Sequence, residues 1–407
     1  MVNSKIHPDS GIGSELAIIL RGTVMIKFFT AFTEEIDDVD LAVSELLGQL
    51  DLGQRCLTYS LGIIHCYSDF VDSGVFKALS EKLPFDSLGS TTISASSSAG
   101  IGQMGLSVTV LTSDDVRFIC GVSAPVEGSV DAPLTELYGR IAAKLPGKPA
   151  MLMPFIPFLP TNGGDEFIDK LDALSGGVPA FGTLAISNEP DFSRSYTFYN
   201  GDFYRASMAL AALVGGVAPE FLSVAVNEEN ILKQKAVITG VERNILTTIN
   251  NMPAVQYLES IGIVRNGDVA GLQSMPFIIY LEDGSMLIRA CIGGGGEGSL
   301  ILCGAVPVNA VIALATMGFE DVVSSTERKV TEALAAANGR GILMYSCAGR
   351  NWSLGMQPMA EHEKVKECLG DTPYHFVYSG GEIFPSSLGG GRTVNHLQND
   401  SLIICML

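Results

Sequence analysis

Apolar and polar positions along the chain repeat one order of elements. Each copy has an amphipathic helix, an apolar strand, a second helix, and a strand that ends in glycine or small polar residues. In the last copy, helical spacing relates Val322, Thr326, Val330, Ala333 and Ala337. Asn338-Gly339 ends this helix, and residues 342–347 then form an apolar run typical of a buried strand.

The three copies occupy different parts of the chain. The first has helix 37–50, strand 58–67, helix 70–83 and the segment LGSTTISASSS from Leu88. The second has helix 133–145, strand 150–157, helix 165–174 and FGTLAISNEPD from Phe181. The third continues with helix 359–369 and strand 374–378. Strands that alternate with helices predict an α/β fold of repeated helix-strand-helix-strand units.

Two strand pairs predict antiparallel additions, and hence mixed sheets flanked by helices. We expect residues 106–111 to pair with 117–122, and residues 277–281 to pair with 286–292. Asp283-Gly284 favours a two-residue hairpin turn in the second pair. The polar stretch 227–234 places a domain boundary near residue 225, so we expect two domains, 20–225 and 226–407.

Composition narrows the class of protein. The chain has 407 residues, and its 44 acidic against 25 basic residues give a net charge of -19. This charge disfavours nucleic acid as a partner, because the summed field repels a polyanion. The start lacks a secretory profile and the eight cysteines form no CxxC pair, so we expect a cytoplasmic protein with reduced thiols.

One uncharged stretch, 299–319, is long enough to span a bilayer. Gly304, Pro307 and Asn309 interrupt it, and it has no basic flank. We therefore expect two buried strands there and no membrane insertion.

Several motifs suggest enzymes but lack the required context. Residues 163–167 spell GGDEF, the motif of diguanylate cyclases, yet no metal-binding acidic strand precedes it, and the acidic pair fits the first turn of a helix. The run Gly293 to Gly296 lacks the Lys-Ser/Thr that follows in a phosphate-binding loop. Four serines have no nucleophile elbow around them, and five histidines show no metal-site spacing: Ser94, Ser96, Ser97, Ser98, His7, His65, His362, His375 and His396. We expect no enzymatic activity.

The C-terminal segment indicates a family. It contains YSCAGRNWSLG from Tyr345, a helix with Glu361, YHFVYSGGEIFP from Tyr374, and a final NHLQNDSLIICML. These motifs resemble the C-terminal FIST domain, with matches at Ser346, Cys347, Gly349, Arg350, Gly381, Glu382 and Ile383. GSMLIRACIGGGGEGSLILCGAVP, which includes Arg289, fits the paired strands of that family. LGSTTISASSSAG and FGTLAISN resemble its N-terminal domain, so the likeness covers roughly residues 20 to 407.

The resemblance implies a sensory module of signal transduction that binds a small ligand and acts on a separately encoded signalling protein. We expect an amino acid or small carboxylate in an interdomain cleft, because ligand sites favour such interfaces. The expected contacts are Arg350, Ser346, Cys347, Gly349, Ser379, Gly381, Glu382, Asn399 and Arg289. Two interpretations of Arg350 stay open: a bidentate contact to a ligand carboxylate, or a structural ion pair with Glu361 or Glu382.

Two alternatives also follow from the resemblance. Some FIST relatives are haem-based gas (nitric oxide) sensors, for which His396, His375 and Cys347 are the candidate axial ligands. Here Gln398 stands where the family has its final histidine, and His396 lies two positions earlier, on the same strand face. The other alternative is a protein-interaction scaffold, as in eukaryotic FIST proteins.

Overall fold

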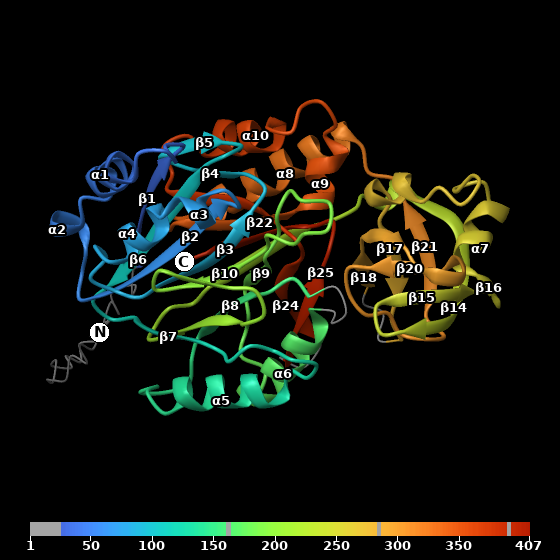
Figure 1. Cartoon of the computed structure of the whole chain (residues 1–407), viewed down its shortest axis with the longest axis horizontal. Coiled ribbons are helices and arrows are strands. Elements are labelled where there is room, and N and C mark those ends of the chain that lie inside the picture. The colour runs from blue at the N-terminus through green and yellow to red at the C-terminus, as the bar shows by residue number, and fades with distance from the viewer. Residues whose placement is uncertain (1–25, 160–163, 283–285, 389–391) are drawn as a thin grey trace, which may run out of the picture.

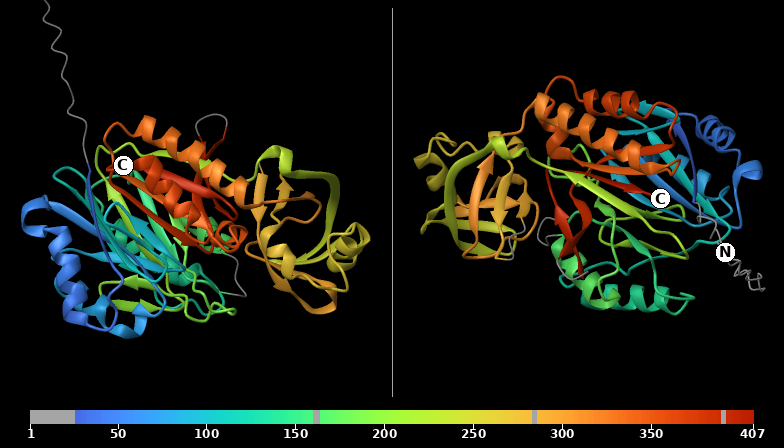
Figure 2. Two further views of the ribbon diagram at one scale, coloured as in Figure 1. Left: turned by 90° about the horizontal axis from the view of Figure 1, so that it is seen from above. Right: turned by 180° about the vertical axis from the view of Figure 1, so that it is seen from behind.

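A computed structural model describes residues 26–159, 164–282, 286–388 and 392–407. The chain forms a large body, residues 26–224 and 318–407, and a small unit, residues 225–317 (Figure 1). In Figure 2 the small unit lies beside one end of the body in both views. The α/β class with mixed sheets is confirmed.

The body is built around three pairs of parallel strands, one for each predicted copy. The pairs are β2 (Tyr59–Tyr67) with β3 (Ser87–Thr92), β8 (Met151–Ile156) with β9 (Gly182–Leu184), and β22 (Ile342–Cys347) with β23 (Tyr374–Ser379). In each copy an antiparallel strand flanks the first member of the pair: β6 (Leu106–Ser113), β12 (Ala209–Val214) and β26 (Leu402–Met406). The predicted repeat therefore corresponds to a repeated piece of sheet.

Each parallel pair lies in a six-stranded sheet. The first sheet adds β1 (Lys27–Thr33), β10 (Thr197–Tyr199) and β11 (Asp202–Tyr204). The second adds β7 (Arg117–Val122), β24 (Glu382–Leu388) and β25 (Arg392–Gln398). The third adds β4 (Ala95–Ser97), β5 (Gly100–Gly102) and β13 (Glu220–Val224). Strands from both halves of the chain thus share the second and third sheets, while the division into domains 20–225 and 226–407 stays a prediction.

The main core lies where the three sheets meet. Its buried side chains include Ile63 of β2, Met153 of β8 and Tyr345 of β22. Because the strands are buried on both faces, they are apolar along most of their length. The ends of these strands are where polar residues gather.

Helices cover the outer faces of the sheets (Figure 1). They are α1 (Val39–Leu50), α2 (Leu52–Arg55), α3 (Phe70–Ser73), α4 (Val75–Ser80), α5 (Asp131–Ala142), α6 (Asp165–Ser175), α8 (Phe319–Ala337), α9 (Ala348–Ser353) and α10 (Ala360–Leu369). The α1 helix begins where the Asp38 side chain accepts a hydrogen bond from the Leu41 N–H, and α6 ends at Gly176 in the left-handed conformation.

The small unit is a strongly curved antiparallel sheet. Its strand order is β18 (Met286–Arg289), β17 (Phe277–Tyr280), β21 (Val311–Ala315), β14 (Ile231–Glu242), β15 (Ile245–Ile249), β20 (Leu300–Leu302) and β19 (Cys291–Gly294), with β16 (Met252–Pro253) paired to β15. Helix α7 (Ala254–Ser260) packs beside this sheet, and the unit has its own apolar core.

Two details of the predicted elements are wrong. Strands β6 and β7 do not pair with each other: β6 pairs with β1 and β2, whereas β7 pairs with β12 in another sheet. The helix expected over 70–83 is two short helices, because Gly74 between them has φ 86°, a conformation that ends a helix.

Three other predictions are confirmed. β17 and β18 pair antiparallel, with Phe277 opposite Arg289, although the Asp283-Gly284 turn lies outside the described residues. The expected pairing extends only to residue 289, because residues 291 and 292 belong to β19, which pairs with β20. Residues 299–319 contain the strands β20 and β21. The acidic pair of the GGDEF letters opens α6, while Gly163 lies outside the described part. Within the described residues, no helix has the length and apolar character needed to cross a bilayer.

Candidate functional site

The carboxyl ends of β22 and β23 meet at one edge of the third sheet, where Cys347 is opposite Ser379. The segment that precedes β26 reaches the same edge, because Ser346 is opposite Leu402. Eight of the nine expected contact residues lie in these segments or in the three residues that follow β22 and β23, and Arg289 comes from the small unit. The fold thus brings together residues that are up to 53 positions apart within the third copy, from Ser346 to Asn399. We call this region the strand-end cluster.

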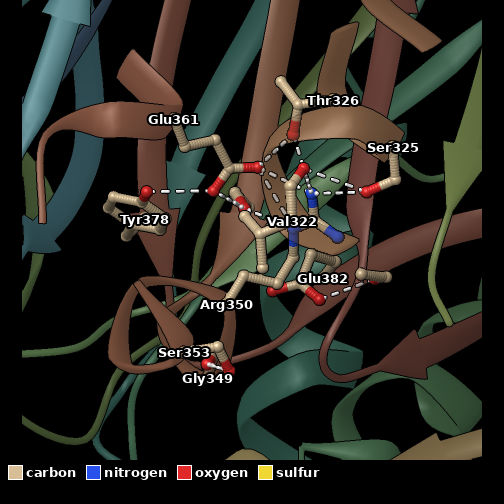
Figure 3. A network of polar contacts seen from close by, with 11 residues as sticks. Val322, Ser325, Thr326, Gly349, Arg350, Ser353, Glu361, Tyr378 and Glu382 are labelled. Carbon is tan, nitrogen blue, oxygen red and sulfur yellow. Dashed lines mark hydrogen bonds and ion pairs between the residues drawn. The ribbon is translucent and has the colours of Figure 1, made fainter. Parts of the chain in front are cut away.

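Arg350 lies in the short helix α9, just after β22, and is fully buried. Its Nη2 donates to Glu361 Oε1 of α10 at 2.8 Å, and its Nε reaches the same oxygen at 3.1 Å (Figure 3). Of the two interpretations of Arg350, the ion pair with Glu361 is therefore present in the structure. A role in ligand contact stays a prediction.

Hydroxyl groups complete the network around this ion pair (Figure 3). Thr326 and Ser325 of α8 accept hydrogen bonds from Arg350 Nη2 at 2.8 and 3.3 Å. Tyr378 and Ser346 donate to Glu361 Oε2 at 2.9 and 3.0 Å. A buried ion pair needs such additional hydrogen bonds to offset its desolvation. One donor of the guanidinium is unsatisfied, because Arg350 Nη1 has no hydrogen-bond partner among the described residues.

A second buried carboxyl, Glu382, begins β24. It accepts hydrogen bonds from Ser379 and Ser401, the latter at 2.7 Å. Burial raises the pKa of Glu382 to about 8, with the nearby Asp400 adding to the rise. Glu382 is therefore mostly protonated at neutral pH.

Asp400, in the turn before β26, is the third buried carboxyl of the cluster. Both of its oxygens are buried, and no described residue donates a hydrogen bond to either. Burial raises its pKa to about 7, although the Arg350 charge acts in the opposite direction. Its backbone has φ 51°, which is uncommon outside glycine and marks a locally constrained residue.

Two glycines leave room for the side chains of Asp400 and Asn399. A Cβ atom on Gly349 would lie 2.0 Å from Asp400 Oδ1, and one on Gly381 would lie 3.0 Å from Asn399 Nδ2. Asn399 Oδ1 accepts a hydrogen bond from the Ala290 N–H at 3.3 Å, but its Nδ2 has no partner in the described part of the chain. The two glycines of the family motif thus allow close approach of polar side chains.

The small unit covers this edge of the body. Arg289 of β18 is buried, and it donates to Asp165 of α6 at 2.7 Å and to the Leu397 carbonyl of β25 at 2.8 Å. Its Nε donates to the Ala305 carbonyl at 2.9 Å, and the Ala305 N–H donates to the second Asp165 oxygen at 2.7 Å. The contacts of Arg289 with Asp165 and Leu397 therefore join the small unit to the body.

Two hollows lie along the junction between body and small unit. An apolar pocket has walls from both parts, formed by Phe158, Phe192, Trp352, Cys347, Gly349 and Gly380 of the body with Ala290, Ile292 and Cys303 of the small unit. A more open cleft of about 340 Å³ has a mixed lining, and we call it the polar cleft because Arg289, Asp165, Asp169 and His396 line it. Cys347 and Gly349 face the first hollow, and Arg289 faces the second.

Comparison with family models identifies the chain. The FIST N domain model matches residues 60–252, and the FIST C domain model matches residues 253–385. The chain belongs to the FIST family. FIST domains are sensory domains of signal transduction, which supports a sensing role for this protein. No curated protein matches the chain.

The two histidines that could be axial haem ligands in this FIST protein have different surroundings. His375 is fully buried, and both ring nitrogens have hydrogen-bond partners: Nε2 lies 2.9 Å from His65 Nδ1, and Nδ1 lies 3.0 Å from Thr109 Oγ1. His396 is half-buried and lines the polar cleft. Cys347 is buried, and burial raises the pKa of its thiol well above the usual range, which disfavours the thiolate that would bind iron.

Sequence reasoning missed several residues of the FIST site. Asp400, Ser401 and Thr326 were not expected as contacts, and α9 was not expected as a helix. An acidic residue directly before an apolar C-terminal strand was the available signal for Asp400. Two of the four serines have a histidine partner that the sequence did not indicate. His362 Nε2 lies 2.8 Å from Ser94 Oγ, and His362 Nδ1 lies 2.8 Å from Ser96 Oγ. Among the described residues, no three His, Cys, Asp or Glu side chains are grouped to hold a metal ion.

Proposed function

We propose that this FIST protein is a cytoplasmic, non-catalytic sensor that binds an amino acid or small carboxylate at the strand-end cluster, beneath the small unit. The proposal rests on one observation. Three polar groups at the ends of β22 and β23 are buried and lack partners among the described residues: the Asp400 carboxyl, Arg350 Nη1 and Asn399 Nδ2. Buried polar groups are nearly always hydrogen-bonded in native proteins, so a cluster of unpaired ones suggests an absent ligand.

The position of the cluster supports the same proposal. In open α/β sheets, ligands bind outside the carboxyl ends of the parallel strands, which is where Ser346, Cys347 and Ser379 lie. The junction with a second part of the protein is also a favoured place for a ligand. Two of the expected contacts support this location, because Gly349 lines the apolar pocket at the junction and Asn399 contacts Ala290 of the small unit.

The small unit offers a means of signalling. Asn399 Oδ1 accepts a hydrogen bond from the Ala290 N–H of the small unit. A ligand that binds the Asn399 amide would therefore change a contact between the body and the small unit. A ligand shifts a conformational equilibrium by its differential affinity for the two states. We propose that a separately encoded signalling protein recognises the resulting position of the small unit.

A thermal-shift screen of the purified chain tests the proposal, with the common amino acids and short carboxylates as probes. We expect at least one class to raise the unfolding temperature in a concentration-dependent way, because a ligand that binds only the native state stabilises it. Asn399→Ala should abolish that shift. Asp169→Asn, an exposed change in the polar cleft, is the matched control and should keep it. Absence of any shift, or loss of the shift in the control alone, would contradict the strand-end location.

A further inference from the structure

A cavity of about 390 Å³ lies beside α2, at the end of the body opposite the small unit (Figure 1). Three segments that lead into strands line it: residues 26–29 lie at the start of β1, Gly341 precedes β22, and Pro373 precedes β23. The cavity thus lies at the amino ends of β22 and β23, whereas the strand-end cluster lies at their carboxyl ends. We call it the amino-end cavity. Its volume is within the range of about 300–1,000 Å³ that is typical of small-molecule sites.

We propose that the amino-end cavity binds a small organic phosphate monoester. Lys27 and Arg55 would hold the phosphate group, and the apolar part of the wall would receive the organic group. This site is separate from the strand-end cluster, so it goes beyond the proposed function and does not depend on it.

The charges of the lining favour a dianion. Lys27 and Arg55 line the amino-end cavity, and no acidic side chain of the described residues does. The whole chain has the opposite balance, with a net charge of -19. Salt screens distant acidic groups beyond about 8–10 Å, so the two cations at the cavity dominate the local field. A phosphate monoester carries a charge of about -1.5 to -2 at neutral pH and matches two cations better than a carboxylate does.

The Arg55 guanidinium is already oriented. Its Cζ atom lies 4.3 Å from the centroid of the Phe29 ring, and its Nη1 donates to the Gln49 carbonyl at 3.3 Å. The described residues provide no hydrogen-bond partner for Nε or Nη2. These two donors lie on one side of the guanidinium plane, and such a pair fits two oxygens of a phosphate group.

Lys27, the first residue of β1, supplies the second cation and is exposed. Hydrogen bonds from Thr58, and more weakly the Lys27 charge, lower the pKa of Asp114. Asp114 accepts a hydrogen bond from Thr58 Oγ1 at 2.6 Å and does not line the cavity. No ion pair within 4.0 Å joins Lys27 to a described carboxylate, so its ammonium group can reach a phosphate oxygen at the cavity.

Apolar side chains in the wall favour an organic phosphate over the inorganic ion. They belong to Ile26, Phe28, Leu57 and Pro373. Phe28 packs closely on Gly341, where an added Cβ would lie 2.3 Å from the ring, so this part of the wall is held in place. An organic group that covers these side chains gains affinity from the burial of apolar surface, which inorganic phosphate cannot gain.

Calorimetric titration of the full chain with phenyl phosphate tests the recognition of charge. We expect phenyl phosphate to bind, and benzoate and inorganic phosphate each to bind about tenfold more weakly, because benzoate has a single charge and inorganic phosphate has no organic group. Arg55→Gln and Lys27→Gln should each weaken phenyl phosphate about tenfold. Both side chains are exposed, so both variants should fold. Lys233→Gln, exposed in β14 of the small unit, is the matched control and should bind phenyl phosphate like the wild type.

A second variant tests the cavity without a change of charge. Gln54 is exposed in α2 and lines the amino-end cavity. Gln54→Trp places a large ring at the cavity, and we expect it to weaken phenyl phosphate about tenfold by steric conflict. Gln54→Ala, at the same position, should leave the affinity unchanged.

The phosphate site is overturned if phenyl phosphate does not bind the wild type, or binds no more tightly than benzoate. It is also overturned if Arg55→Gln and Lys27→Gln bind phenyl phosphate like the wild type, or if Gln54→Trp has no effect.

Asn399→Ala distinguishes this site from the strand-end cluster. We expect it to leave phenyl phosphate binding unchanged, although it should abolish the thermal shift caused by amino acids or carboxylates. Loss of phenyl phosphate binding in Asn399→Ala would place the probe at the strand-end cluster and overturn the amino-end site. Absence of any thermal shift with amino acids and carboxylates, together with tight phenyl phosphate binding, would refute the proposed function and leave the phosphate site standing.

Discussion

Arg289 and Asp165 form an ion pair of 2.7 Å across the junction between the small unit and the body. The Arg289 side chain is 1% exposed and that of Asp165 is 18% exposed, so solvent screens this pair only weakly. Asp165 belongs to the GGDEF letters, which thus supply a structural contact in this protein rather than a hairpin of a cyclase. The pair should govern how firmly the small unit is held.

Asp165→Asn should loosen this junction. The change leaves the buried Arg289 charge without its counter-ion, and we expect a loss of about 2–4 kcal/mol in the free energy of unfolding. Urea unfolding measures that loss, and hydrogen exchange should show faster opening of β18 and residues 303–307. Asp169→Asn, one turn further along α6 and exposed, serves as control and should change stability by less than about 0.5 kcal/mol. Equal stability of the two variants would show that the ion pair does not fasten the small unit.

Glu361→Gln should be one of the most destabilising substitutions in the body. It removes the charge that neutralises the fully buried Arg350 guanidinium, and breaking a buried pair in this way costs about 3–5 kcal/mol. Chemical denaturation followed by circular dichroism gives the value. Lys329→Ala, which removes the i,i+3 partner of Glu332 on the exposed side of α8, should cost no more than about 0.5 kcal/mol. A loss below 1 kcal/mol for Glu361→Gln would mean that Arg350 readily finds another partner.

Position 304 requires glycine because of its backbone conformation and the close approach of Arg289 and Asp165. It has φ 140°, and a Cβ there would lie 2.7 Å from Arg289 Nε and 2.8 Å from Asp165 Oδ2. Gly304→Ala should therefore cost at least about 2 kcal/mol and weaken the same junction. Gly48→Ala is the informative contrast, since Gly48 lies in α1 with open space around it. Alanine should stabilise that helix by about 0.5–1 kcal/mol, so unfolding midpoints of the two variants should move in opposite directions.

The sequence predicted the local elements of this fold better than their assembly. Strands such as β8 and β22 are apolar because both faces are buried, and α8 has a clear apolar stripe, so each leaves a local pattern. The choice of which strands pair with one another leaves no such pattern in the sequence. Nothing in the sequence between β6 and β7 indicates that the two strands belong to different sheets. Only three residues, 114–116, separate them, so a hairpin was the natural but wrong expectation.

The site shows the same limit. The family motif led to Arg350, Gly349 and Glu382, but Asp400 carries no motif and becomes notable only because the fold buries it without a partner. Burial and hydrogen-bond satisfaction depend on segments far apart in the chain. The Arg350 partner Thr326, for example, lies 24 residues away on another helix. Such relationships are properties of the packed structure.

Buried titratable groups make stability depend on pH in two opposite directions. His65, His362 and His375 are fully buried, and burial lowers their pKa values, to about 3 for His362 and His375. Burial raises the pKa of Glu382 to about 8 and that of Asp400 to about 7. The unfolded chain therefore takes up protons at the histidines below about pH 6.5, and loses them from the two carboxyls above about pH 4.5.

These shifts predict a stability maximum near pH 6.5. Below that pH the unfolded state binds more protons at the three histidines than the native state does, so stability falls as pH falls. Between about pH 4.5 and 6.5 the two carboxyls, still protonated only in the native state, partly offset this loss. Below about pH 4.5 the unfolded carboxyls are protonated too, and the fall should steepen toward about 4 kcal/mol per pH unit.

Above pH 6.5 the carboxyls alone decide the trend. Glu382 and Asp400 keep their protons in the native state but not in the unfolded state, so stability should decline until the pH passes their native pKa values of about 8 and 7. Asp400→Asn removes one of the two groups, so its decline should be about half as steep between pH 6.5 and 7. On the acid side its fall should be steeper than that of the wild type between about pH 4.5 and 6.5, where one offsetting carboxyl is lost, and equally steep below about pH 4. Urea unfolding of both proteins from pH 4 to 9 provides the test. If the wild type and Asp400→Asn ran parallel on the alkaline side, Asp400 would be ionised in the native protein, and a partner for its carboxylate would have to be present.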